Sequence, residues 1–166
     1  MKKTNAMRIL DQAKIPYTTE EYDDDGEHVL ERGAAERLSK KLGIDPECCF
    51  KTIVMRTDSR EVVVFCQNAL NEINLKKARA ACGAKEITPC KQDELLGLTG
   101  YIRGGCSPIG MKRKFRTFID ESVLLQEKVY VSAGVRGQQI CLSPKDLIAV
   151  TQATTVDLIL EKYTSL

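Results

Sequence analysis

Hydrophobic residues repeat at intervals of three and four along several segments of the chain, which is the period of an amphipathic helix. In the first of these segments, apolar side chains occupy positions 6, 9, 10 and 13, and Thr4 precedes them as a favoured N-cap residue. Gly43 and Gly83 follow two later segments, as glycine commonly does at helix ends. The pattern predicts helices over 5–13, 31–42 and 88–96. It also predicts a helix that Asn74 caps and that runs through Ala81, and a fifth helix that starts after Ser143.

Apolar residues dominate two further segments, 51–56 (KTIVMR) and 61–66 (EVVVFC), which is typical of strands. The residues between them, TDSR, are suited to a turn, so the two segments are predicted to form a hairpin. Other short strands are predicted over 15–22, 117–119, 129–132 and 138–142. Because strands and helices are interspersed, we expect residues 1–166 to form a single domain of the mixed α/β (α+β) class. Its sheet is expected to be mixed and mainly antiparallel, or to close partly into a barrel, with flanking helices.

Charge and composition narrow the classes of function. The 25 lysines and arginines against 23 aspartates and glutamates leave a net charge of +2, too little for a protein that coats nucleic acid, so any RNA contact must be local. One local basic cluster, at 112–116, directly follows a glycine-rich loop. The N-terminal residues contain no apolar signal-peptide core, and no segment approaches the roughly 18 apolar residues of a membrane span. We therefore expect a cytoplasmic protein.

Several kinds of catalytic or cofactor site are excluded by residues that the sequence lacks. His28 is the only histidine and lies in an acidic stretch typical of a solvent-facing turn, so a hydrolase triad has no base. The seven cysteines have no CxxC spacing, which indicates reduced thiols and no zinc site. The glycine-rich loop has the outer spacing of a phosphate-binding loop, but Met111 stands where such a loop needs lysine. We therefore expect neither a metal ion nor another cofactor.

Three segments combine residue types suited to ligand binding. Lys51 and Thr52 place an ammonium and a hydroxyl at the start of an apolar strand, although such a lysine often only extends into solvent. The loop 104–110 (GGCSPIG) combines three glycines with a proline, which favours backbone N–H groups that face a ligand, and an ordinary structural turn is the alternative. The connection 132–137 (SAGVRG) holds a hydroxyl and a guanidinium between two strands, or else forms a plain hairpin.

Taken in series, these segments resemble the YbaK/prolyl-tRNA editing domain family. The resemblance is carried by KTIV at 51–54, by TGY at 99–101 leading into the loop 104–110, and by SAGVRG at 132–137. The order and spacing of these segments and the length of the chain agree with the family, and the resemblance covers nearly the whole chain. Within the family, the chain is most similar to the free-standing bacterial deacylases that remove cysteine wrongly attached to proline tRNA.

The resemblance implies which residues form the site. Lys51 matches the family's functional lysine, so we expect it to be the catalytic residue and to hydrogen-bond the ester or an oxygen of the terminal nucleotide. The expected substrate-binding residues are Tyr22, Thr52, Gly104, Gly105, Ser107, Pro108, Gly110, Ser132, Gly134 and Arg136. Cys106 lies within the glycine-rich loop, but no histidine lies near it in the sequence, so we expect a small packing residue and not a nucleophile.

The resemblance also implies a reaction. In the cysteine-specific members, the substrate's own thiol is proposed to attack its ester carbonyl, which releases tRNA and a thiolactone and requires positioning more than a protein base. We therefore expect a trans-editing deacylase for Cys-tRNA(Pro). The alternatives are an Ala-tRNA(Pro) deacylase that activates water and a non-catalytic module that binds RNA or a small ligand. The expected partner is the aminoacylated acceptor end of tRNA, with prolyl-tRNA synthetase as a further partner, and neither DNA nor a membrane is expected.

Overall fold

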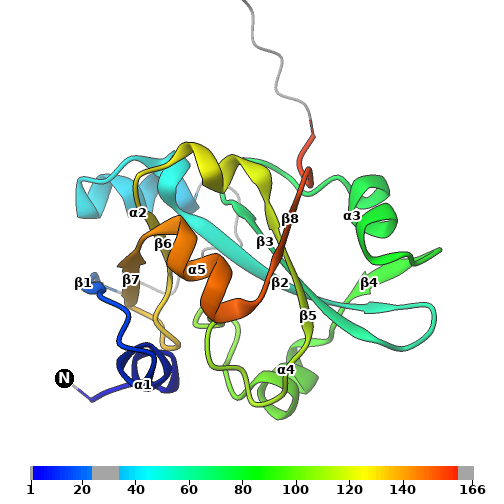
Figure 1. Cartoon of the computed structure of the whole chain (residues 1–166), viewed down its shortest axis with the longest axis horizontal. Coiled ribbons are helices and arrows are strands. Elements are labelled where there is room, and N and C mark those ends of the chain that lie inside the picture. Colours follow the sequence, from blue (N-terminus) through cyan, green and yellow to red (C-terminus); the bar gives the residue numbers. More distant parts are fainter. Residues whose placement is uncertain (1, 24–33, 161–166) are drawn as a thin grey trace, which may run out of the picture.

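The computed structural model describes residues 2–23 and 34–160 (Figure 1). The predicted turn around His28 and residues 31–33 of a predicted helix lie outside the described residues. Within the described ranges, no helix has the length and apolar character needed to cross a membrane. In chain order the elements are α1 (Asn5–Gln12), β1 (Thr18–Glu21), α2 (Ala34–Leu42), a short 3-10 helix (Pro46–Cys48), β2 (Phe50–Thr57), β3 (Val62–Asn68), α3 (Leu75–Cys82), β4 (Ile87–Pro89), α4 (Gln92–Thr99), β5 (Arg116–Asp120), a second 3-10 helix (Glu121–Leu125), β6 (Val129–Ser132), β7 (Gln138–Leu142), α5 (Pro144–Thr151) and β8 (Thr154–Val156).

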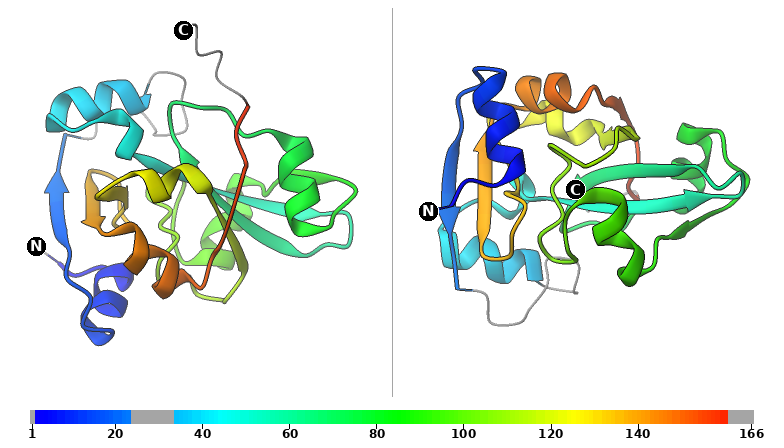
Figure 2. Two further views of the ribbon diagram at one scale, coloured as in Figure 1. Left: turned by 45° about the horizontal axis from the view of Figure 1, so that its top comes forward. Right: turned by 90° about the horizontal axis from the view of Figure 1, so that it is seen from below.

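The strands divide between two sheets (Figures 1 and 2). A three-stranded antiparallel sheet has the order β1-β7-β6, and a five-stranded sheet has the order β4-β2-β3-β5-β8. In the larger sheet, β2 is antiparallel to β3 and β4, whereas β5 is parallel to β3 and β8. The prediction of a mixed, mainly antiparallel α/β fold is confirmed. The described strands form two sheets and do not close into a barrel.

Three helix starts that the sequence predicts are confirmed by their N-caps. The side chains of Thr4, Asn74 and Ser143 each accept a hydrogen bond from a backbone N–H two or three residues further on, at 3.0 to 3.2 Å. These bonds satisfy N–H groups that the first turn of a helix leaves without an intrahelical partner. Local chemistry therefore fixes where α1, α3 and α5 begin.

The prediction that a helix starts at Thr88-Pro89 is wrong. Residues Ile87–Pro89 form β4, which pairs with the end of β2, and α4 begins only at Gln92. β4 is an edge strand, where a proline is tolerated because no further strand needs its missing N–H. Pairing with β2 thus outweighs the local helix-start signal. The two 3-10 helices and β8 have no counterpart in the sequence prediction, because segments this short carry no clear periodicity.

The two faces of the five-stranded sheet carry different layers, with α3 on one face and α4 on the other (Figure 2). On the α3 face, Met55 and Phe65 pack with Ala78 of the helix. On the α4 face, Val54 packs with Leu95. Successive side chains of a strand point to opposite faces, so β2 contributes to both layers. A third apolar cluster joins α1 and α5 to the three-stranded sheet.

Candidate active site

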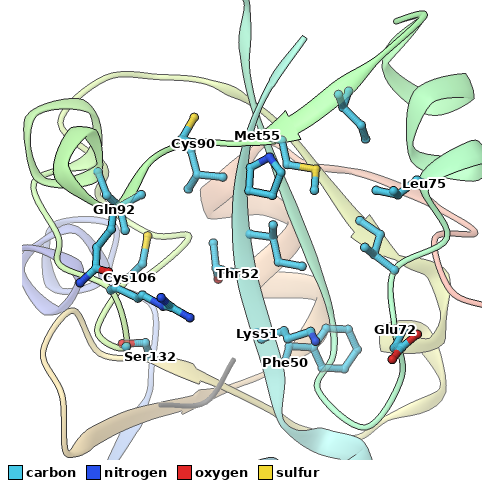
Figure 3. A pocket seen from close by; sticks show the side chains of 18 of the residues that line it. Phe50, Lys51, Thr52, Met55, Glu72, Leu75, Cys90, Gln92, Cys106 and Ser132 are labelled. Carbon is cyan, nitrogen blue, oxygen red and sulfur yellow. The ribbon is translucent and has the colours of Figure 1, made fainter. Parts of the chain in front are cut away.

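A cavity of about 620 Å³ lies along an open edge of β2 (Figure 3). β4 pairs only with residues 55–57 of β2, and Tyr130 of the three-stranded sheet forms a bridge with Cys49, the residue just before β2. In the described part of the chain, no strand pairs with the intervening stretch of β2 on this edge. This gap in the sheet holds Lys51 and Thr52, and loops from both sides of the sheet close around it.

The backbone of Thr52 faces the gap. Val54 C=O accepts a hydrogen bond from Cys90 N–H across the same edge, at 2.9 Å. Alternate residues of a strand direct their N–H and C=O groups to the same side, so those of Thr52 also point to this edge. A ligand in the cavity therefore meets one main-chain donor and one main-chain acceptor at the centre of the gap. The Thr52 hydroxyl lies 3.9 Å from Cys66 Sγ.

Lys51 brings a partly buried ammonium to the cavity. Its side chain and that of Glu72 lie on the same side of β2 and both face the cavity (Figure 3). Burial lowers the pKa of Lys51, and the negative charge of Glu72 opposes part of this shift. Among the described residues, no hydrogen bond or ion pair engages the ammonium. It is therefore available to an oxygen atom of a ligand.

Two loops that touch each other form the opposite wall. Gly104 contributes from the loop after α4, and Ser132 contributes from the end of β6. Gly105 is buried between them, where a Cβ atom would lie 3.0 Å from the backbone nitrogen of Arg136. A side chain at this position would force the backbone of the second loop to shift, so glycine allows the close approach. Arg136 Nε also donates to Arg103 C=O at 3.0 Å, which ties the two loops together.

Gly134 fixes the second of these loops against Tyr101. Its φ is +103°, and a Cβ atom at this position would lie 2.7 Å from Tyr101 Cε1. Tyr101 is buried, and its hydroxyl donates to Ile109 C=O at 2.6 Å, so the ring is held at both ends. The segments TGY and SAGVRG, which the sequence analysis associated through a family resemblance, are therefore in direct contact.

Four of the residues predicted to form the site line the cavity: Lys51, Thr52, Gly104 and Ser132. The lining does not include the other seven, which are Tyr22, Gly105, Ser107, Pro108, Gly110, Gly134 and Arg136. All of these seven except Tyr22 belong to the two loops that form the wall, but they do not face the cavity. Ser107 is fully buried and accepts a hydrogen bond from Ile109 N–H at 3.2 Å, and Tyr22 N–H donates to Gly137 C=O at 2.9 Å. Direct substrate contacts by these residues stay predictions.

Cys106 lines the cavity, but its thiol is a poor nucleophile. Burial raises the pKa of the Cys106 thiol to about 12, so very little thiolate is present near neutral pH. The residue belongs to the apolar cluster on the α4 face, together with Val54 and Leu95. These surroundings suit the small packing residue that the sequence analysis expected.

Four polar residues of the cavity were not predicted from the sequence: Glu72, Gln92, Arg103 and Gln139. Gln139 is only 3% exposed and lies opposite Ser132 in the pairing of β6 with β7. A glutamine inside an apolar strand was the available signal, because buried amides are uncommon. Glu72 and Arg103 are exposed loop residues, and only the fold brings them to the site. Within the described ranges, no three His, Cys, Asp or Glu side chains are grouped to hold a metal ion.

The basic residues of the cluster at 112–116 differ in their surroundings. Arg116 forms two hydrogen bonds of 2.8 Å with the carboxylate of Glu61, so its charge is already paired. Lys112, Arg113 and Lys114 are exposed on the chain that leaves the glycine-rich loop. The part of the cluster that remains open to an RNA phosphate is therefore 112–114.

Comparison with known proteins gives a consistent set of relatives. Residues 31–150 match the family described as the aminoacyl-tRNA editing domain. EbsC of Enterococcus faecalis, described as a candidate Cys-tRNA(Pro)/Cys-tRNA(Cys) deacylase, is 40% identical over 149 residues, which are 90% of this chain and 88% of that protein. The proline–tRNA ligase of Bacillus licheniformis is 31% identical over 88 residues, which are 53% of this chain and 15% of the ligase. A crystal structure described as a candidate trans-editing enzyme for prolyl tRNA synthetase superposes with a TM-score of 0.81 at 21% identity, over 97% of this chain and 100% of that one.

Proposed function

Because the chain belongs to the aminoacyl-tRNA editing domain family, we propose that it is a free-standing deacylase that removes cysteine from Cys-tRNA(Pro). The relative from Enterococcus faecalis supports this substrate, since its description specifies cysteine and the two chains align over most of their lengths. The similarity to part of a proline–tRNA ligase supports prolyl-tRNA synthetase as the partner that delivers the mischarged tRNA. These relatives do not favour the Ala-tRNA(Pro) alternative.

The position of Lys51 carries the proposal. Its ammonium, which has no ion-pair or hydrogen-bond partner in the described part of the chain, lies at a gap in the sheet where the Thr52 N–H also faces the cavity. Charged and main-chain donors that are fixed before the substrate arrives stabilise the negative charge that develops on an ester oxygen during acyl transfer. In this proposal, Lys51 is the catalytic residue. The loops that carry Gly104 and Ser132 enclose the aminoacyl group.

The proposed reaction uses the substrate as its own nucleophile. The cysteine sulfur attacks the carbonyl carbon of the ester, so an S–C bond forms and the C–O bond to the ribose breaks. The thiol proton ends on the ribose oxygen, and the products are tRNA and a cysteine thiolactone. Lys51 stabilises charge on the carbonyl or leaving oxygen, while the loops hold the thiol close to the carbonyl. No protein thiol is needed, which agrees with the high pKa of Cys106.

The deacylation rate is expected to depend on whether the side chain of the attached amino acid is a nucleophile. Cys-tRNA(Pro) should be deacylated at least about a hundredfold faster than Ser-tRNA(Pro) or Ala-tRNA(Pro), because a hydroxyl is a weaker nucleophile than a thiol and a methyl group is none. Initial rates with radiolabelled aminoacyl-tRNAs test this expectation, and mass spectrometry of the early product distinguishes thiolactone from free cysteine. Comparable rates on the seryl ester would contradict cyclisation. A stable cysteinyl ester would contradict the deacylase itself.

Activity is also expected to depend on the protonation of Lys51. The active form is the ammonium, which is present below the pKa of Lys51 and is lost as the pH rises through it. Burial places this pKa below the usual lysine value of 10.5. Glu72→Gln removes the charge that supports the ammonium, so the alkaline loss of activity should move to lower pH. The measurement is the ratio of kcat/KM for the variant and wild type from about pH 7 to about pH 9.5, which cancels titration of the substrate. A ratio that does not change with pH contradicts the prediction.

A further inference from the structure

We propose that the α3 side of the cavity binds the terminal adenosine of tRNA, with the adenine on an apolar shelf and the ribose beside Glu72. This inference rests on the proposed function, because it assigns the part of the substrate that the cysteine pocket does not hold. The apolar shelf consists of Ile53, Met55, Ile73, Leu75, Ile87 and Pro89, all of which line the cavity.

The size of the cavity requires a second group besides the amino acid. A volume of about 620 Å³ lies within the range of pockets that hold drug-sized ligands and is far larger than a cysteine side chain needs. The ester of an amino acid with a nucleoside is a ligand of that larger class. The nucleoside part is present on every aminoacyl-tRNA, so the site must accommodate it next to the ester.

The two sides of the cavity differ in chemistry. Thr52, Cys106 and Ser132 lie to one side of β2, whereas Glu72 and Leu75 lie to the other (Figure 3). The loops that close the first side are in contact through glycine, and its small hydroxyl and thiol side chains suit the aminoacyl group. The second side is lined mostly by the apolar shelf. The ester would then cross the gap between them, at Lys51 and the backbone of Thr52.

The apolar shelf has the features of a surface for a flat base. Ile53, Met55, Ile73 and Ile87 belong to one apolar cluster on the α3 face, so the shelf is continuous with the core. Leu75 stands at its outer end and is 44% exposed, which leaves an apolar side chain in water unless a ligand covers it. The flat face of a purine loses little free energy of hydration when it leaves water, and it gains van der Waals contact with such a surface.

Glu72 adds a polar group at the edge of the shelf. Its carboxylate is a hydrogen-bond acceptor, and carboxylates recognise ribose hydroxyls in other nucleotide sites. The loop that carries it is held in place, since Gln67 Nε2 donates to Asn71 C=O at 2.6 Å and Leu160 N–H donates to Glu72 C=O at 3.3 Å. The shelf and the carboxylate are therefore formed before a ligand arrives, which favours specific binding.

A binding experiment tests the shelf without any catalysis. The full-length protein, labelled with ¹³C in the methyl groups of Ile, Leu and Met, is titrated with 5′-AMP and, separately, with ribose 5-phosphate. AMP should shift the methyl signals of Ile53, Met55 and Leu75, and ribose 5-phosphate should not. Leu124, which is 60% exposed and outside the cavity, serves as the control signal and should stay unchanged. AMP that leaves the shelf signals unmoved overturns the inference.

A kinetic experiment tests the same shelf with the substrate. Removing the terminal base from Cys-tRNA(Pro), so that an abasic ribose carries the ester, should lower kcat/KM about tenfold, because the base then buries no apolar surface against the shelf. Leu75→Ala should raise KM for the normal substrate with little change in kcat, and should not affect the abasic substrate. Leu124→Ala is the matched control and should behave as the wild type on both, with thermal melting confirming the fold of each variant.

The outcomes separate the shelf from the proposed reaction. If Leu75→Ala raises KM equally for the normal and the abasic substrate, the shelf is overturned, because the effect of the variant would then not depend on the base. Equal rates of the wild type on the two substrates overturn it as well. A protein that binds AMP on the shelf but cleaves no cysteinyl ester supports the shelf and overturns the deacylase assignment.

Discussion

Replacing Lys51 by alanine is expected to lower kcat/KM for Cys-tRNA(Pro) at least about a hundredfold, because no ammonium then lies beside the Thr52 N–H at the gap in β2. The fold should survive. Lys51 is half-buried without an ion pair among the described residues, and burial disfavours its charge, so its loss should change the free energy of unfolding by less than about 1 kcal/mol. Deacylation rates and a chemical denaturation curve for the same preparation measure both effects.

Two further variants show whether the charge of Lys51 is responsible. Lys51→Met keeps most of the aliphatic stem and removes only the ammonium, so it should lose as much activity as the alanine variant. Lys76→Ala removes an exposed lysine at the start of α3, away from the cavity lining, and should retain the wild-type rate. If Lys51→Ala kept more than about a tenth of the wild-type kcat/KM, the ammonium would have no major part in the mechanism.

Gly134→Ala is expected to be the most damaging single-methyl change in the wall of the site. The new Cβ atom would lie 2.7 Å from Tyr101 Cε1, and the backbone has a φ of +103°, which side chains rarely adopt. Tyr101 is buried and its hydroxyl is engaged, so the ring is unable to move aside cheaply. We expect a loss of about 2 to 4 kcal/mol in the free energy of unfolding. Activity should fall as well, because the loop with Ser132 would be displaced.

Two other glycines separate the causes of this loss. Gly83 has a φ of +73°, but no atom lies within 4 Å of a Cβ built there, so Gly83→Ala should cost only the backbone strain of about 1 kcal/mol. Gly97 lies within α4 with open space around it, so Gly97→Ala should be neutral or stabilise the protein by up to about 1 kcal/mol. Urea denaturation of the three variants gives the comparison. Equal costs for Gly83→Ala and Gly134→Ala would show that contact with Tyr101 contributes nothing.

Local features of the fold were predictable because they depend on neighbours in the sequence. The N-caps at Thr4, Asn74 and Ser143 satisfy backbone groups only two or three residues away, and the hairpin of β2 and β3 needs only a short turn between two apolar runs. The prediction failed at Thr88-Pro89, where a distant strand competes with the local signal for a helix. Pairing with β2 supplies hydrogen bonds that a sequence window of ten residues does not contain.

The sequence by itself determined the elements, the fold class and, through three spaced segments, the family to which the chain belongs. It also singled out Lys51, but not the residues that share its cavity. Only the tertiary structure placed Glu72 and Leu75 on one side of β2 and Ser132 on the other, because these residues come from segments far apart in the chain. The open edge itself is a tertiary feature, since it exists only where β4 ends and the three-stranded sheet turns away. Backbone groups that face a gap of this kind have no signature in a sequence, because every residue except proline carries the same N–H and C=O.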